Sequence, residues 1–141
     1  LPPDDCPEWF EASDAHNLDR VFLIAPSSTD ERVALTMGSC RGWVYATSVM
    51  GVTGARSATS DAAPVIVGRA RAIDPTIPVG IGLGVSNGAQ AAEIGGYADL
   101  VIVGSALLKC LDSDGADMPG DLRRLRALSG ELAAGVASAR P

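Results

Sequence analysis

The sequence predicts an α/β protein built on a parallel sheet. Runs of Val and Ile recur along the 141 residues, and each is followed by a segment of helical composition, as in repeated βα units. These runs are almost wholly apolar, which predicts strands buried on both faces. Glycine-bearing turns follow three of the four runs. A doubly wound sheet and a closed barrel both satisfy these observations, because hydrophobic periodicity does not separate them.

The first βα unit is preceded by a helix predicted over Glu8–Asn17, with Pro7 at its start, where the missing N–H of proline costs no hydrogen bond. Residues 21–25 form the first predicted strand. Ser28, with Glu31 three residues later, predicts a capping box at the start of the next helix.

Residues 42–47 form the second predicted strand. The Gly/Ser/Thr-rich stretch 50–59 that follows is longer than a minimal βα turn needs. The helix after it is predicted from three apolar residues that share one face at helical spacing, namely Ile66, Ala70 and Ile73.

The third predicted strand is 78–83, and Asn87 and Gln90 behind it stand at capping-box spacing. Residues 100–103 form the fourth strand, which leads into a short helix over 106–111. A last helix from about Pro119 carries a stripe of leucines suited to packing on the outside of a sheet, made of Leu122, Leu125, Leu128 and Leu132.

Composition narrows the class of partner. The net charge of −6, from 11 basic and 17 acidic residues, argues against nucleic acid. No apolar run approaches the roughly 18 residues of a membrane span, so we expect a cytoplasmic protein that does not bind membranes. Because Leu1 stands where a start methionine would, we expect the sequence to begin inside a longer chain.

The residues that most often bind metals are sparse. Cys6, Cys40 and Cys110 are far apart and lack Cys-x-x-Cys pairing, so we expect reduced, packed thiols and neither disulfides nor zinc. His16 is the only histidine and stands in a polar stretch, which predicts a surface position. We therefore expect no metal site and no cofactor.

The glycine-bearing turns predict a phosphate site. They are Gly51–Gly54, Gly82–Ser86 and Gly104-Ser105, each just after a strand, where parallel α/β proteins bind their ligands. Glycine lets backbone N–H groups approach an anion without a Cβ in between. Tight turns alone would also explain each glycine singly. A dinucleotide site is not favoured, because Gly80-x-Gly82-x-Gly84 is not G-x-G-x-x-G and no acidic residue follows at the expected distance.

Residues 45–56, reading YATSVMGVTGAR, resemble the sixth strand and mobile loop of the tryptophan synthase α subunit family. LPPDD, VFLIAPSSTDER, GIGLGVS and ADLVIVGSAL agree with the family in order and spacing. The resemblance implies the C-terminal half of a (β/α)8 TIM barrel, with strands 5–8 and their helices. Residues 1–141 would then belong to one barrel domain, with no separate second domain.

The resemblance also implies a lyase that cleaves indole-3-glycerol phosphate to indole and glyceraldehyde 3-phosphate, and a tryptophan synthase β subunit as partner in an α2β2 complex. The family's mobile loop falls on Gly51 and Thr53. Its phosphate ligands fall on Gly54, Gly84, Gly104 and Ser105. Its indole-pocket positions fall on Tyr45, Leu23, Leu83 and Ile102.

The family's two catalytic carboxylates belong to the first half of the barrel, so the resemblance assigns no catalytic residue to this chain and implies that it is inactive by itself. Two alternatives remain. One is a non-catalytic phosphate-binding half-barrel that serves as an interaction module. The other is a different phosphate-binding barrel, such as indole-glycerol-phosphate synthase.

Overall fold

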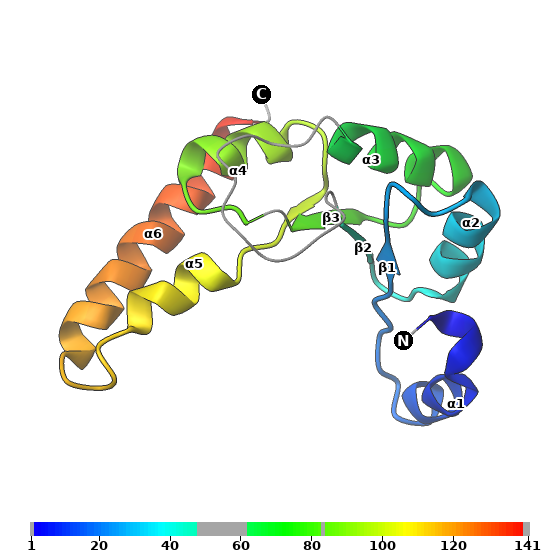
Figure 1. Cartoon of the computed structure of the whole chain (residues 1–141), viewed down its shortest axis with the longest axis horizontal. Helices are drawn as coiled ribbons and strands as arrows, with labels where there is room; N and C mark the ends of the chain where they lie inside the picture. Colours follow the sequence, from blue (N-terminus) through cyan, green and yellow to red (C-terminus); the bar gives the residue numbers. More distant parts are fainter. Residues whose placement is uncertain (1, 48–61, 83, 140–141) are drawn as a thin grey trace.

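The computed structural model describes residues 2–47, 62–82 and 84–139 (Figure 1). The predictions for Gly51, Thr53, Gly54 and Leu83 lie outside these residues. The described part contains four strands, which are β1 (Leu23–Ile24), β2 (Val44–Thr47), β3 (Val79–Gly82) and β4 (Leu100–Val101).

The four strands form one parallel sheet in the order β1-β2-β3-β4. Each strand therefore pairs with the next one in the sequence. A doubly wound sheet reverses its strand order at a switch point, whereas a barrel keeps the strands in sequential order around the ring. The observed order is that of a barrel segment, a distinction that hydrophobic periodicity alone could not make.

Helices cover one face of this sheet. Figure 1 shows α2 (Asp30–Ser39), α3 (Ala62–Ile73) and α4 (Gly88–Gly95) arranged in an arc along one side of the strands. The core lies between the helices and this face. Its strand side chains are Ile24, Val44, Ala46, Val79 and Ile81, and its helix side chains include Val33, Met37, Ile66, Val67, Ala91 and Ile94.

The expectation that the strands are buried on both faces is wrong for this chain. Leu23 is 64% exposed and Leu100 is 39% exposed. The register pairs Leu23 with Tyr45, Tyr45 with Gly80 and Gly80 with Leu100, so these residues share the face opposite the core. We call this the open face. In a closed barrel it would point at the opposite strands, and no described element takes their place.

Two hydroxyl residues, Ser28 and Thr29, precede α2, and the predicted cap at Ser28 falls one residue before the observed cap at Thr29. The side chain of Thr29 accepts a hydrogen bond of 3.2 Å from the backbone N–H of Arg32. The hydroxyl of Ser28 instead accepts from the backbone N–H of Ala25, also at 3.2 Å. The Ser28 capping box is therefore wrong, because the preceding turn already uses that hydroxyl.

The N-terminal segment packs on the β1 end of the sheet. It contains a short 3-10 helix, η1 (Pro3–Asp5), and then α1 (Pro7–Ala15). The rings of Phe10 and Phe22 stack with centroids 5.7 Å apart, and the guanidinium of Arg20 lies 4.6 Å from the Phe10 ring centroid. Cys6 is buried and His16 is exposed, as predicted.

The C-terminal segment contains α5 (Ser105–Leu108), the 3-10 helix η2 (Lys109–Leu111) and the long helix α6 (Met118–Ser138). The carboxylate of Asp117 caps α6 by accepting from the N–H of Gly120 at 3.0 Å, so the helix begins one residue before the predicted Pro119. α6 packs along α4. Of the leucine stripe, Leu132 is buried and Leu122 is 53% exposed.

Candidate substrate site

The strands are parallel and sequential, so their carboxyl ends share one edge of the sheet. β3 leads into Gly84 and Val85, and β4 leads through Ile102 and Val103 into Gly104. The predicted phosphate ligands within the described residues thus lie at the ends of two adjacent strands.

Gly84 has a backbone conformation that favours glycine. Its φ is +63°, which L side chains rarely adopt, and apart from its chain neighbours no heavy atom of the described residues lies within 4 Å of the position a Cβ would take. The residue is exposed. Among the described residues, no side chain beyond the chain neighbours blocks the approach of a ligand to Gly84 at this position.

Gly104 and Ser105 make the second half of the site. The carbonyl of Gly104 accepts from the N–H groups of Leu107 and Leu108 at 3.0 and 3.2 Å, which fixes the turn, while no side chain caps α5. Both Gly104 and Ser105 are exposed. None of the hydrogen bonds among the described residues uses the backbone N–H of Gly84, Gly104 or Ser105. Within the described residues, these three N–H groups have no acceptor, and the residues that carry them are exposed at one edge of the sheet.

The first turn of α4, between those two turns, already has its own acceptors. The side chain of Asn87 accepts from the N–H of Gln90 at 2.9 Å, as the predicted cap requires. Gln90 returns a bond to Ser86 rather than to Asn87, with its Oε1 accepting from the Ser86 N–H at 2.9 Å. The carboxylate of Glu131 accepts from the N–H of Gly88 at 2.7 Å. An anion bound at this edge must rely on the glycine turns more than on the start of α4.

Three of the predicted indole-pocket residues, Tyr45, Leu23 and Ile102, lie on the open face. The phenol oxygen of Tyr45 lies where a Cβ of residue 82 would be, and the Tyr45 Cζ is 2.7 Å from that position. Ile102 approaches the same position from the other side, with its Cβ at 3.3 Å. Leu23 neighbours Tyr45 in the register. Because residue 82 is glycine, Tyr45 and Ile102 meet across β3.

Trp43 shares this face and was not among the predicted site residues. Its ring centroid lies 6.1 Å from that of Tyr45, with the two planes at 30°. A Cβ at Gly80 would lie 2.7 Å from Trp43 Cζ3 and 3.1 Å from Ile102 Cδ1. The sequence contains Trp43-x-Tyr45 on one strand and Gly80-x-Gly82 on the next, but only the strand register shows that the two aromatic residues lie over the two glycines.

The acid–base chemistry of the described residues is limited at this edge. Glu31 stands in the first turn of α2, beyond the end of β1, and hydrogen bonds from its own backbone N–H and from Thr29 hold the pKa of its carboxyl below the ordinary value. A lowered pKa keeps Glu31 ionised near neutral pH and unsuited to act as a general acid. No group of three or more His, Cys, Asp or Glu within residues 2–47, 62–82 and 84–139 could hold a metal ion.

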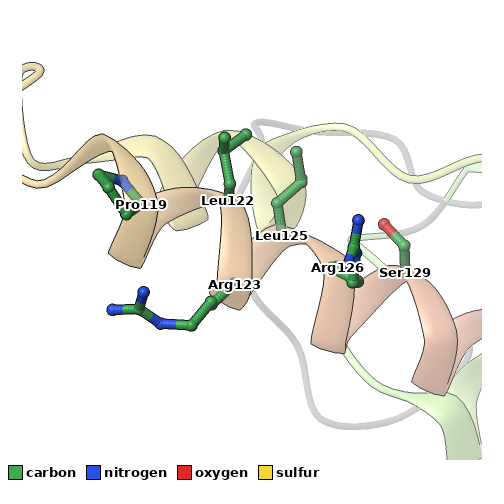
Figure 2. Close-up of a pocket in the computed structure, with 6 residues that line it drawn as sticks. All are labelled: Pro119, Leu122, Arg123, Leu125, Arg126 and Ser129. Carbon is green, nitrogen blue, oxygen red and sulfur yellow. The ribbon is translucent and has the colours of Figure 1, made fainter.

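A surface hollow of about 510 Å³ lies elsewhere, on α6. Figure 2 shows Leu122 and Leu125 projecting from the helix on one side and Arg123 on another; Pro119, Arg126 and Ser129 complete the lining. The hollow lies along the outside of one helix and includes none of the predicted site residues. It continues the partly exposed leucine stripe and is an uncovered packing face.

None of the described helices has the length and apolar character needed to cross a bilayer.

Comparisons with known proteins agree with this geometry. A family model described as tryptophan synthase alpha chain matches residues 1–137. The tryptophan synthase alpha chain of Acidothermus cellulolyticus is 57% identical over 136 residues, covering 96% of this chain and 49% of the relative. That of Mycobacterium tuberculosis is 60% identical, covering 96% and 47%. The chain thus spans about half the length of the curated relatives it matches.

Solved structures give the same result for the fold. A tryptophan synthase structure from Mycobacterium tuberculosis superposes with a TM-score of 0.83 at 57% identity, over 96% of this chain and 49% of the other. The tryptophan synthase a2b2 complex of Pyrococcus furiosus gives 0.79 at 31% identity, over 95% and 53%. The predicted fold class is confirmed: the chain forms about half of a TIM barrel.

Proposed function

We propose that this chain, which belongs to the tryptophan synthase alpha chain family, supplies the phosphate site and part of the indole pocket of a lyase that cleaves indole-3-glycerol phosphate to indole and glyceraldehyde 3-phosphate. One observation carries the proposal. The exposed residues Gly84, Gly104 and Ser105 follow β3 and β4, next to the open face on which Tyr45 and Ile102 meet across β3.

The phosphate end is served by backbone groups. The N–H groups of Gly84, Gly104 and Ser105 and the Ser105 hydroxyl can donate to phosphate oxygens, and none of them needs a lysine or arginine nearby. Gly54, in the loop after β2, completes this set in the proposal. Gly51 and Thr53 belong to the same loop, which we propose closes over the substrate.

The indole end is served by the open face. Tyr45, Leu23 and Ile102 offer aromatic and aliphatic surface beside the strand ends, and Leu83 joins them in the proposal. A substrate with a flat apolar ring at one end and a phosphate at the other matches this division between face and edge. The site needs no cofactor for the proposed cleavage.

The reaction needs groups that the described residues do not bring together. Cleavage protonates C3 of the indole ring, breaks the bond from C3 to the glycerol chain, and removes the proton of the adjacent hydroxyl as the aldehyde forms. A positioned acid and a positioned base must carry these protons. We therefore propose that this half binds and orients the substrate, and that the half of the relatives not matched here supplies the carboxylates.

The proposal also includes a partner protein and a cellular location. The related Pyrococcus furiosus protein was solved as an a2b2 complex, and we propose that this chain likewise functions with a tryptophan synthase β subunit that receives the indole. We place the enzyme in the cytoplasm, because a charged phosphate ester stays on the side of the membrane on which it is made.

A chimera tests the function. The 141 residues replace the matching half of the Mycobacterium tuberculosis alpha chain, to which they are 60% identical. The chimera should release indole from indole-3-glycerol phosphate. Ser105→Ala should raise KM roughly tenfold, because a hydrogen bond to a charged group contributes about 1.5 kcal/mol. Ser129→Ala, on the outside of α6, is the matched control and should leave KM unchanged.

A folded chimera that releases no indole would overturn the proposal and favour a non-catalytic phosphate-binding half-barrel. Formation of indole-3-glycerol phosphate from its open-chain precursor, without cleavage, would instead favour indole-glycerol-phosphate synthase. The family match over residues 1–137 supports the alpha chain over both.

A further inference from the structure

We propose that Trp43 forms the floor of the indole pocket and decides which ring sizes the pocket accepts. This inference rests on the proposed function, since it concerns the same substrate ring. Neither the glycine turns nor the family resemblance predicted Trp43 as a site residue. Its assignment comes from the way its ring is held on the open face.

The position of Trp43 follows from the direction of β2. The strand runs from Val44 to Thr47 toward the edge where the phosphate donors lie. Trp43 precedes Tyr45 by two residues, so both side chains point to the same face and Trp43 lies one step further from that edge. A ring entering from the edge would meet Tyr45 first and Trp43 last.

The backbone of β3 fixes where the Trp43 ring lies. A Cβ on residue 80 would be 2.7 Å from Trp43 Cζ3 and 2.9 Å from Cε3, so the ring occupies the volume that any side chain at Gly80 would need. Ile102 Cδ1 lies 3.1 Å from the same position and limits the ring on the far side. The ring is held between two strands rather than projecting freely.

The Tyr45 ring borders the space above Trp43. The two rings lie 6.1 Å apart at 30°, a tilted pair within the range in which aromatic side chains attract each other. Tyr45 crosses β3 at Gly82 in the same way that Trp43 crosses it at Gly80. The two rings therefore lie one after the other along β3, over Gly82 and Gly80. In the proposed pocket, Tyr45 forms a side wall and Trp43 forms the base.

Selectivity for ring size follows from this arrangement. The largest side chain at the base of the pocket should limit the depth available to a ring that enters from the edge. A smaller residue at position 43 should admit substituents on the benzene side of indole that the parent pocket excludes. Single methylene differences in apolar pockets change kcat/KM by roughly 10- to 200-fold, so the effect is measurable.

The test runs the reaction toward condensation, in the chimera described above, with glyceraldehyde 3-phosphate and indoles that carry one methyl group on the benzene ring. Trp43→Leu should raise the ratio of kcat/KM for methylindole to that for indole at least about tenfold for one isomer. Trp43→Phe should raise it less. Trp9→Leu is the control, because Trp9 is 42% exposed on α1, and its ratios should match the parent.

Gly80→Ala gives an independent measurement in the opposite direction. The added methyl should push the Trp43 ring into the pocket, raising KM for indole and lowering the methylindole ratios further. If Trp43→Leu fails to fold, Trp43→Phe and Gly80→Ala still move the ratios in opposite directions. Ratios within twofold of the parent in folded, active variants would overturn the role of Trp43 and leave the proposed function intact. A folded parent chimera without any indole chemistry would overturn both.

Discussion

The carboxylate of Glu131 in α6 accepts a hydrogen bond of 2.7 Å from the backbone N–H of Gly88 at the start of α4. One turn later in α6, a Cβ on Gly135 would lie 2.8 Å from the carbonyl carbon of Gly88 and 2.9 Å from its Cα. The two helices therefore approach backbone to backbone at Gly88. This contact holds the start of α4 next to the glycine turns of the proposed phosphate site.

Gly135→Ala should destabilise the chimera by about 1–3 kcal/mol, since the new methyl must displace backbone rather than a flexible side chain. Gly130→Ala is the matched control in the same helix. Apart from its chain neighbours and the backbone of its own helix, no atom of the described residues lies within 4 Å of its Cβ position, so it should stabilise by about 0.5–1 kcal/mol through helix propensity. Urea unfolding measures both. Equal shifts in the two variants would show that α4 and α6 are not in close contact.

Cys40 should react slowly with iodoacetamide at pH 8. Burial raises the pKa of the Cys40 thiol above its ordinary value of 9.0, so less thiolate is present at any given pH. Its alkylation rate in the folded chimera, followed by mass spectrometry of the Cys40 peptide, should keep rising with pH beyond 9. The same peptide in urea is the control and should level off at lower pH. Identical pH profiles in the folded and unfolded protein would contradict the packed position of Cys40.

Thr53→Val in the chimera should lower kcat much more than it lowers stability. The resemblance places Thr53 in the loop that closes over the substrate, and closure completes such sites. Valine keeps the shape and removes the hydroxyl, so the melting temperature should stay within a few degrees of the parent. Turnover equal to that of the parent would remove Thr53 from the proposed loop function.

The 141-residue polypeptide by itself should associate or remain partly disordered, and it should release no indole. Each fully buried large apolar side chain contributes roughly 1.5–3 kcal/mol, against a typical total stability of 5–15 kcal/mol. Leu23, Leu100 and Leu122 are 64%, 39% and 53% exposed, and β1 and β4 each have only one neighbour among the described strands. Light scattering measures the association state, and an indole assay measures cleavage. A compact monomer that melts cooperatively, or any cleavage, would contradict this prediction.

Sequence patterns predicted all four strands, and the differences lie at their ends. Of the strand predicted over 21–25, only Leu23–Ile24 forms a β-strand in the structure. Of the strand predicted over 100–103, only Leu100–Val101 does so. These are the two outer strands of the sheet, where a single neighbour limits the ladder. Burial of the open face could not be judged from apolar composition, because composition indicates which residues can be buried and not whether a partner is present.

At one predicted site position, the structure gives a physical reason for the residue type. Gly84 was singled out as a glycine that exposes backbone, and its φ of +63° is a conformation that favours glycine. Trp43 was not predicted, because its proposed role depends on its contact with Gly80 of the neighbouring strand, which only the strand register reveals. Glu131 was missed for the same reason, since it lies 43 residues from the N–H group it binds.

A crystal structure of the chimera with a bound phosphate ester tests the central claim most directly. The account predicts phosphate density at the carboxyl ends of β3 and β4, within hydrogen-bond distance of the N–H groups of Gly84, Gly104 and Ser105, and with the ester's apolar end against Tyr45. Density at the opposite, amino-terminal ends of the strands, or in the hollow on α6, would contradict it.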